Sequence, residues 1–63
     1  MYNGTKIKLK RIELGISSKE FSKVINMSRY QLSAIENQRV KEPKFSTIMK
    51  ISKALNVTVE ELI

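Results

Sequence analysis

The chain has 63 residues, and its twelve Lys and Arg against six acidic residues give a net charge of +6. A chain of this length forms one domain, residues 1–63, with little room for an internal active site. The sequence contains no Cys, no His and no Asp. Because metal sites and catalytic nucleophile–base pairs draw on these side chains, we expect no enzyme, no metal or cofactor site and no small-molecule substrate.

The distribution of charge and of apolar residues bears on partners and location. No apolar run approaches the roughly 20 residues that span a bilayer, and the first residues contain no signal-peptide core, so we expect no membrane partner and a cytoplasmic location. All twelve basic residues precede residue 54, whereas Glu60 and Glu61 lie near the end of the chain. A basic body of this kind suits a polyanionic partner. The alternative is that Lys side chains on solvated helix faces only keep a small protein soluble.

Helical signals recur along the whole chain and predict an all-α fold, a compact domain of five helices. The first helix spans roughly residues 5–14 and ends at Gly15, a residue that adopts the left-handed conformation without a steric penalty.

Two capping boxes then follow, Ser17-x-x-Glu20 and Ser28-x-x-Gln31. In such a box the Ser oxygen accepts a hydrogen bond from a backbone N–H, and the Glu or Gln side chain reaches back to the capping residue. The boxes predict a second helix over residues 18–25, ending near Asn26, and a third over residues 29–36. The short turn between the second and third helices makes them a helix-turn-helix.

The last part of the chain begins with a polar loop that ends at Pro43, since proline disfavours helix at the residue before it. The fourth helix spans roughly residues 45–55. Thr58-x-x-Glu61 is a third capping box, so a final turn or two of helix closes the chain.

Apolar residues recur at spacings of three and four, as expected for helices that bury one face. The predicted core comprises Phe21, Val24 and Ile25 on the second helix, Leu32 and Ile35 on the third, Ile48, Ile51 and Leu55 on the fourth, and Val57 and Leu62 at the end.

Two charged residues interrupt this pattern. Arg11 lies on the stripe formed by Ile7 and Leu14, and Glu36 lies beside the core positions of the third helix. We expect Arg11 and Glu36 to pair between the first and third helices, because the guanidinium fork binds a carboxylate through two hydrogen bonds. The alternative is that the first helix turns Leu9 and Ile12 inward and leaves Arg11 in solvent.

A set of motifs spans nearly the whole chain: Arg11-x-x-x-Gly15-Ile16-Ser17, Phe21-Ser22, Met27-Ser28-Arg29, Ile35-Glu36-Asn37, Pro43 and Ile48-x-x-Ile51-Ser52-x-Ala54-Leu55-Asn56-Val57. As a set, they resemble the Cro/repressor-type helix-turn-helix domains of phage repressors and small bacterial regulators, the XRE-like family. Many members have an ion pair at the positions of Arg11 and Glu36. Ser22 departs from the family's Ala, and Asn26 and Gln38 from its Gly.

The resemblance implies that the third helix lies in the major groove of double-stranded DNA. The implied base-reading residues are Arg29, Tyr30, Gln31, Ser33 and Ala34, and the implied phosphate contacts are Ser17, Ser18, Asn37, Arg39, Lys41 and Lys44. Several of these residues have alternatives. Gln31 either caps its own helix or reads adenine, and Tyr30 contacts a thymine methyl or a phosphate or is merely exposed. Lys41 and Lys44 are each equally well explained as a solvated charge.

The predicted function is a transcriptional repressor that binds a double-stranded DNA operator as a homodimer, with Val59 and Ile63 available for the two-fold contact. Two alternatives stay open. One is a protein-interaction module, such as an antitoxin-like or adapter helix-turn-helix protein, and the other is non-specific compaction of nucleic acid.

Overall fold

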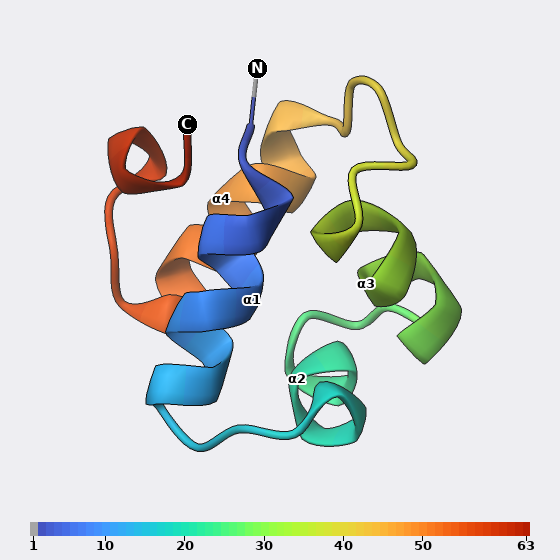
Figure 1. Ribbon diagram of the computed structural model, residues 1–63, viewed down its shortest axis with the longest axis vertical. Coiled ribbons are helices and arrows are strands. Elements are labelled where there is room, and N and C mark those ends of the chain that lie inside the picture. The colour runs from blue at the N-terminus through green and yellow to red at the C-terminus, as the bar shows by residue number, and fades with distance from the viewer. Residues whose placement is uncertain (1) are drawn as a thin grey trace.

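Residues 2–63 are described by the computed structural model, in which helices enclose one small core (Figure 1). The elements are α1 (Gly4–Glu13), α2 (Ser18–Val24), α3 (Arg29–Glu36), α4 (Phe45–Leu55) and the 3-10 helix η1 (Val59–Leu62). The predicted all-helical architecture is confirmed for these residues, and none of the helices is long and apolar enough to cross a bilayer.

The count of five helices was only partly right, because η1 is a 3-10 helix and only four α-helices are present in residues 2–63. The Thr58 side chain caps this segment by accepting from the backbone N–H of Glu61, as its capping box predicts. The segment is only four residues long, and its backbone bonds run from residue i+3 to residue i. So short a segment closes 3-10 turns more readily than α-helical ones.

The capping boxes start α2 and α3 at the predicted residues. At α3 the box is complete, since Ser28 Oγ accepts from the N–H of Gln31 and Gln31 Oε1 accepts from the N–H of Ser28. At α2 only half of the box forms, because the Glu20 carboxylate accepts from the Ser17 hydroxyl instead of the Ser17 backbone. Asn26 adopts the left-handed conformation with φ 55°, as predicted for the end of α2.

The core contains nearly all the residues that the helical spacing selects, with two exceptions. Phe21, Ile7, Ile25, Leu32, Ile51 and Leu62 are almost completely buried. Val24 is 67% exposed and Leu14 is 53% exposed, so both expectations for these residues were wrong. On α2, Ser22 is buried beside Phe21, whereas Val24 lies outside the buried stripe. Leu14 follows the last residue of α1, where the chain leaves the helical path toward the left-handed Gly15.

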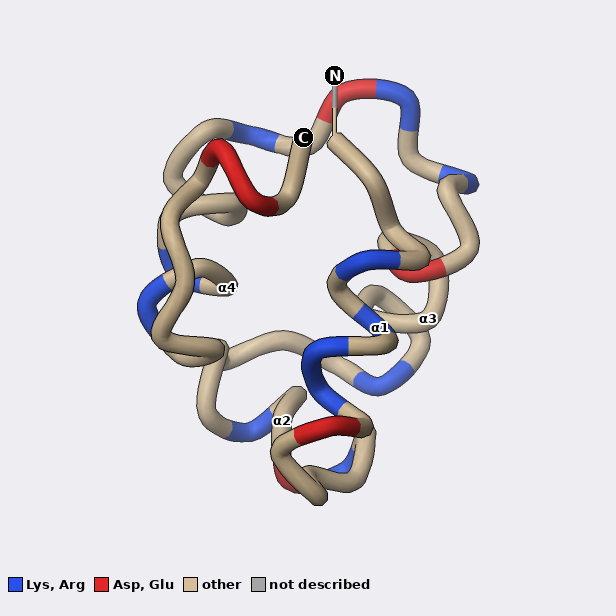
Figure 2. Tube along the Cα trace, turned by 60° about the vertical axis from the view of Figure 1, so that its left-hand side comes forward, with Lys and Arg blue, Asp and Glu red and all other residues tan. Residues whose placement is uncertain are grey.

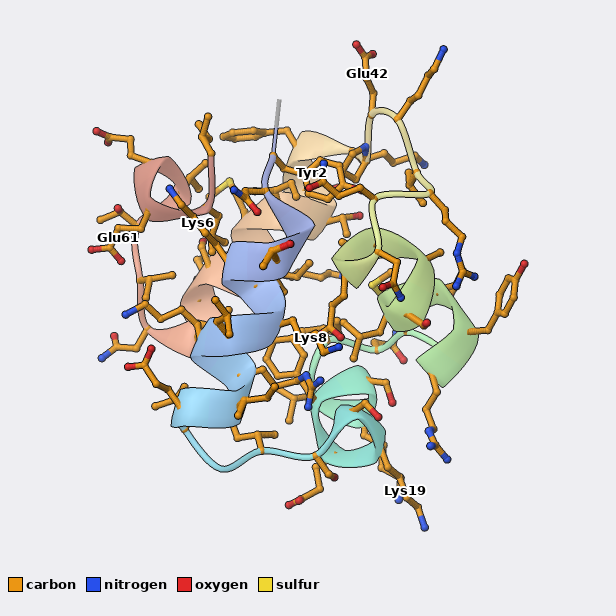
Figure 3. All side chains as sticks on the ribbon, in the orientation of Figure 1. Tyr2, Lys6, Lys8, Lys19, Glu42 and Glu61 are labelled. Atoms are coloured by element: carbon orange, nitrogen blue, oxygen red, sulfur yellow. The ribbon has the colours of Figure 1, made fainter. Side chains whose placement is uncertain are left out.

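The N-terminal segment contacts the end of α3, the loop that follows α3, and η1. Tyr2, which is buried, donates its hydroxyl to the carbonyl of Val40 at 2.7 Å, and the Asn3 N–H donates to the carbonyl of Leu62 at 2.7 Å. Lys6 reaches toward the C-terminal segment, where its ammonium donates to the carbonyl of Ile63 (Figure 3). Gly4 begins α1 against the last carbonyls of α3, at a distance that leaves no space for a Cβ. This segment therefore fixes α1 against the end of α3.

Candidate nucleic-acid interface

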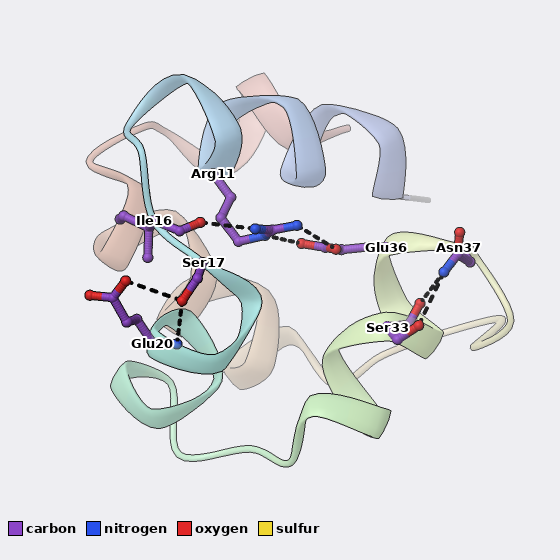
Figure 4. A network of polar contacts seen from close by, with 7 residues as sticks. All are labelled: Arg11, Ile16, Ser17, Glu20, Ser33, Glu36 and Asn37. Carbon is purple, nitrogen blue, oxygen red and sulfur yellow. Dashed lines mark hydrogen bonds and ion pairs between the residues drawn. The ribbon is translucent and has the colours of Figure 1, made fainter.

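A buried ion pair sets the position of α3 relative to α1. Arg11 Nε donates to Glu36 Oε2 at 2.8 Å, and Arg11 Nη2 donates to Glu36 Oε1 at 3.3 Å (Figure 4). The remaining guanidinium nitrogen donates to the carbonyl of Ile16, between α1 and α2. Leu9 and Ile12 are exposed, so the inward orientation of Arg11 is confirmed and its alternative is excluded. One side chain thus joins α1, the α1–α2 connection and the last turn of α3.

With Leu32, Ile35 and Glu36 turned inward, the opposite side of α3 is open to solvent. Tyr30 is 76% exposed, and Arg29 and Gln31 are exposed beside it. Ser33 and Ala34 are half-buried one turn further along. The five residues predicted to read bases therefore all lie on accessible parts of this helix.

Gln31 was expected either to cap its own helix or to read adenine, and the structure shows the capping role. A backbone N–H can only donate, which requires the Gln31 oxygen to face Ser28. The amide nitrogen then points elsewhere, and Gln31 offers outside the box only N–H donors. Reading adenine through both amide atoms would need the oxygen as well, and is not compatible with the cap.

Asn37 is held by Ser33. Its side-chain nitrogen donates to the Ser33 carbonyl at 2.8 Å and to the Ser33 hydroxyl at 3.2 Å (Figure 4). Ser33 and Asn37 therefore form a coupled polar pair at the C-terminal end of α3.

A shallow depression adjoins this pair and contains a basic residue that the sequence analysis missed. Lys8 on α1 and Ser18 at the start of α2 line the depression together with Arg29 and Asn37 of the α3 segment. Figure 3 places Lys8 on the side of α1 that faces α2 and α3. The signal for Lys8 was its position three residues before Arg11, which puts both side chains on neighbouring parts of one helix face.

Apart from Asn37 at the end of α3, the residues predicted to contact phosphates lie in two places. Ser17 and Ser18 are at the N-terminus of α2, where the Ser17 hydroxyl is engaged with Glu20 in the cap. Arg39, Lys41 and Lys44 are exposed on the loop between α3 and α4. The ion pairs found in residues 2–63 are Lys10–Glu13 and Arg11–Glu36, so these loop charges are not neutralised by an acidic side chain of the described part of the chain.

Most acidic residues lie away from this surface, but Glu42 is exposed in the loop between α3 and α4. Glu60 and Glu61 belong to η1, which lies across the molecule from α3 (Figures 1 and 2). Glu36, the acidic residue of α3, is paired with Arg11. The loop after α3 sets three basic residues against the single Glu42, so together with the exposed side of α3 it keeps a net positive charge.

Comparisons with known proteins agree with this geometry. The model of a helix-turn-helix family (HTH_3) matches residues 7–62. A crystal structure of SinR, described as the master regulator for biofilm formation in complex with DNA, is similar with a TM-score of 0.87 and 32% identity. The alignment covers 95% of this chain and 98% of that one. A search of curated protein sequences gave no significant match.

Proposed function

Since the chain belongs to the Cro/repressor-type (XRE-type) helix-turn-helix family, we propose that it is a sequence-specific regulator of transcription that places α3 in the major groove of double-stranded DNA. The observation that carries the proposal is the solvent-exposed side of α3, which begins with Arg29 and Tyr30 and is held outward by the buried Arg11–Glu36 pair. SinR, whose similar domain is described in complex with DNA, supports it.

Base reading is assigned to the outward side of α3. Arg29 is exposed at the first position of the helix and can donate two hydrogen bonds to guanine O6 and N7, a contact worth about 1–3 kcal/mol of discrimination. Tyr30 can pack on a thymine methyl, and the small Ala34 allows close approach of the helix. Gln31, limited to its N–H donors by the cap, can reach guanine or a phosphate but not both atoms of adenine.

Phosphate contacts are assigned to the residues that flank this helix. The N-terminus of α2 offers backbone N–H groups beside Ser18, and Lys8 lines the adjacent depression. Arg39, Lys41 and Lys44 follow α3 on the other side. Such contacts position the protein without reading sequence, and they make binding dependent on salt.

The protein acts as a homodimer, because one recognition helix covers only a few base pairs and two half-sites lie about one helical turn, ~34 Å, apart. An apolar groove supports this assembly. Its lining includes Pro43, Phe45, Val59 and Ile63, together with the charged residues Lys41 and Glu42. Phe45 and Ile63 are 67% and 59% exposed. A second copy docked here would bury these side chains. Repression is the proposed output, since an occupied operator excludes other proteins from the same duplex without further contacts.

The proposal is tested by selecting ligands from random duplex DNA and titrating the selected duplex with salt. We expect a palindromic site and an affinity that falls steeply as salt rises. Arg29→Ala is expected to relax the preference at one base position, whereas Arg39→Ala is expected to weaken all duplexes alike. Lys50→Ala removes the same charge from the exposed surface of α4 and is the matched control. If no duplex binds at low salt, the interaction-module alternative is favoured.

The dimer is tested separately. Phe45→Glu places a charge in the apolar groove at an exposed site, so the fold is retained while the two-fold contact is weakened. Leu9→Glu, at a residue 56% exposed on α1, introduces the same charge outside the groove. Sedimentation of the protein on a two-half-site duplex should show one copy for Phe45→Glu and two for Leu9→Glu. Equal stoichiometry for the two variants contradicts the assignment of the groove.

A further inference from the structure

The hydrogen bonds of Asn37 restrict what its side chain can recognise. Resting on the DNA-binding function proposed above, we infer that Asn37 reads the exocyclic amino group of a base, in the first place adenine, and does not clamp a phosphate. The resemblance to the helix-turn-helix family implied a phosphate contact at this residue instead.

The nitrogen of the Asn37 amide is engaged within the protein. Nδ2 donates to the Ser33 carbonyl at 2.8 Å and to the Ser33 hydroxyl at 3.2 Å (Figure 4). A carbonyl oxygen only accepts, so the nitrogen of the amide has to face Ser33 and its Oδ1 has to face away. No group in residues 2–63 donates to this Oδ1. The carbonyl oxygen Oδ1 is therefore the group that Asn37 offers to a ligand.

The position of Asn37 places this acceptor on the side of α3 that faces the duplex. Tyr30, Ala34 and Asn37 follow one another at spacings of four and three, so they form one stripe opposite the buried residues of α3. Asn37 is exposed and is the C-cap residue that directly follows the last residue of α3, with φ −97° and ψ 10°. The acceptor thus lies one turn beyond Ala34 on the stripe that Tyr30 begins.

The chemistry of DNA limits the partners of a lone acceptor. Phosphate oxygens cannot donate, and in the major groove guanine O6 and thymine O4 also only accept. The groups that donate there are adenine N6 and cytosine N4. The Ser33 hydroxyl accepts from Asn37 and keeps its own proton for donation. With the Ser33 hydroxyl as a donor to N7 and Asn37 Oδ1 as an acceptor from N6, the two residues match adenine, whereas cytosine offers no counterpart to N7.

The experiment measures the affinity of the protein for its selected duplex and for duplexes in which one adenine of a half-site is replaced, position by position, by purine lacking the 6-amino group. For the wild type, removal of one amino group should weaken binding about tenfold, since a lost hydrogen bond leaves the Asn37 oxygen unpaired at the interface. For Asn37→Ala the same replacement should have no effect at that position, although the affinity for the unmodified duplex is lower. Replacement of the same adenine by 7-deazaadenine removes N7, the assigned partner of the Ser33 hydroxyl. This replacement should weaken DNA binding by the wild type but not by Ser33→Ala, a variant that keeps the Asn37 oxygen.

Three outcomes overturn the inference. If Asn37→Ala weakens all duplexes by one common factor, the residue is a phosphate contact or a structural cap. If Asn37→Ala has the wild-type response to amino-group removal at every adenine, another residue reads that group. If the wild type binds no duplex at low salt, the proposed function itself fails. The first two outcomes differ from this one because in them the wild type still forms a salt-sensitive complex with DNA.

Discussion

Removal of either partner of the Arg11–Glu36 pair is expected to destabilise this domain strongly. Both residues are more than nine-tenths buried, and Arg11 makes three hydrogen bonds, at 2.8, 3.3 and 2.9 Å. Arg11→Met keeps most of the buried volume but leaves the Glu36 carboxylate buried without its cation. Removing one partner of a buried pair costs about 3–5 kcal/mol.

This cost is large relative to the stability of so small a domain. At roughly 0.05–0.15 kcal/mol per residue, 63 residues correspond to a free energy of unfolding of about 3–9 kcal/mol. We therefore expect Arg11→Met to be largely unfolded at 37 °C, whereas the double variant Arg11→Met with Glu36→Leu should recover much of the loss, because an apolar pair replaces the buried charges. Urea unfolding followed by circular dichroism at 222 nm gives the four free energies of the double-mutant cycle.

The matched control for the cycle is Lys10→Met with Glu13→Leu, at an exposed pair on α1 whose nitrogen and oxygen are 4.0 Å apart. An exposed pair contributes about 0–1 kcal/mol, so this cycle should show little coupling. A loss below about 1 kcal/mol for Arg11→Met, or additive losses in the first cycle, would refute the conclusion that the buried pair holds α3 against α1.

Three further predictions concern single residues. Gly4→Ala should destabilise the domain by about 1–3 kcal/mol, because the new Cβ meets backbone carbonyls of α3, and thermal unfolding measures the loss. Gln38→Gly should raise the melting temperature, since a non-glycine residue at φ 56° pays about 1–2 kcal/mol for the left-handed conformation; an unchanged or lower value contradicts this account. Burial raises the pKa of the Tyr2 hydroxyl more than its hydrogen bond to Val40 lowers it, so the native state retains this proton more strongly than the unfolded state. The stability that this proton contributes is present below pH 10 and is lost as the pH rises above 10. Above pH 10 the free energy of unfolding should therefore fall less steeply with pH for Tyr2→Phe than for the wild type. Equal slopes for the two proteins would contradict the assignment.

Local signals explain why the helices could be placed closely from the sequence. Capping residues and left-handed turn positions act within a few residues of the backbone groups that they satisfy, so Ser28, Gln31 and Asn26 have the predicted roles. Tyr2 had no such signal. Its burial depends on the loop that supplies the Val40 carbonyl 38 residues away, and no periodicity of the first residues indicates that contact.

For the candidate interface, residue types alone left several roles undecided. An amide side chain carries a donor and an acceptor, and only the neighbours in the folded chain decide which of them is used internally. In Gln31 the cap engages the acceptor, and in Asn37 the contact with Ser33 engages the donors, so two chemically similar side chains present opposite groups to a ligand.

The amino-acid sequence by itself determined where the helices begin, which residues fill most of the core, and that Arg11 and Glu36 have complementary charges on facing stripes, because each of these follows from short-range hydrogen bonding or from helical spacing. Only the tertiary structure decided that Val24 and Leu14 are exposed, that Lys8 lies beside Ser18 and Arg29, and which atoms of Asn37 remain available. These depend on how separate helices pack against one another, and packing is set by the simultaneous fit of many side chains that no single segment specifies.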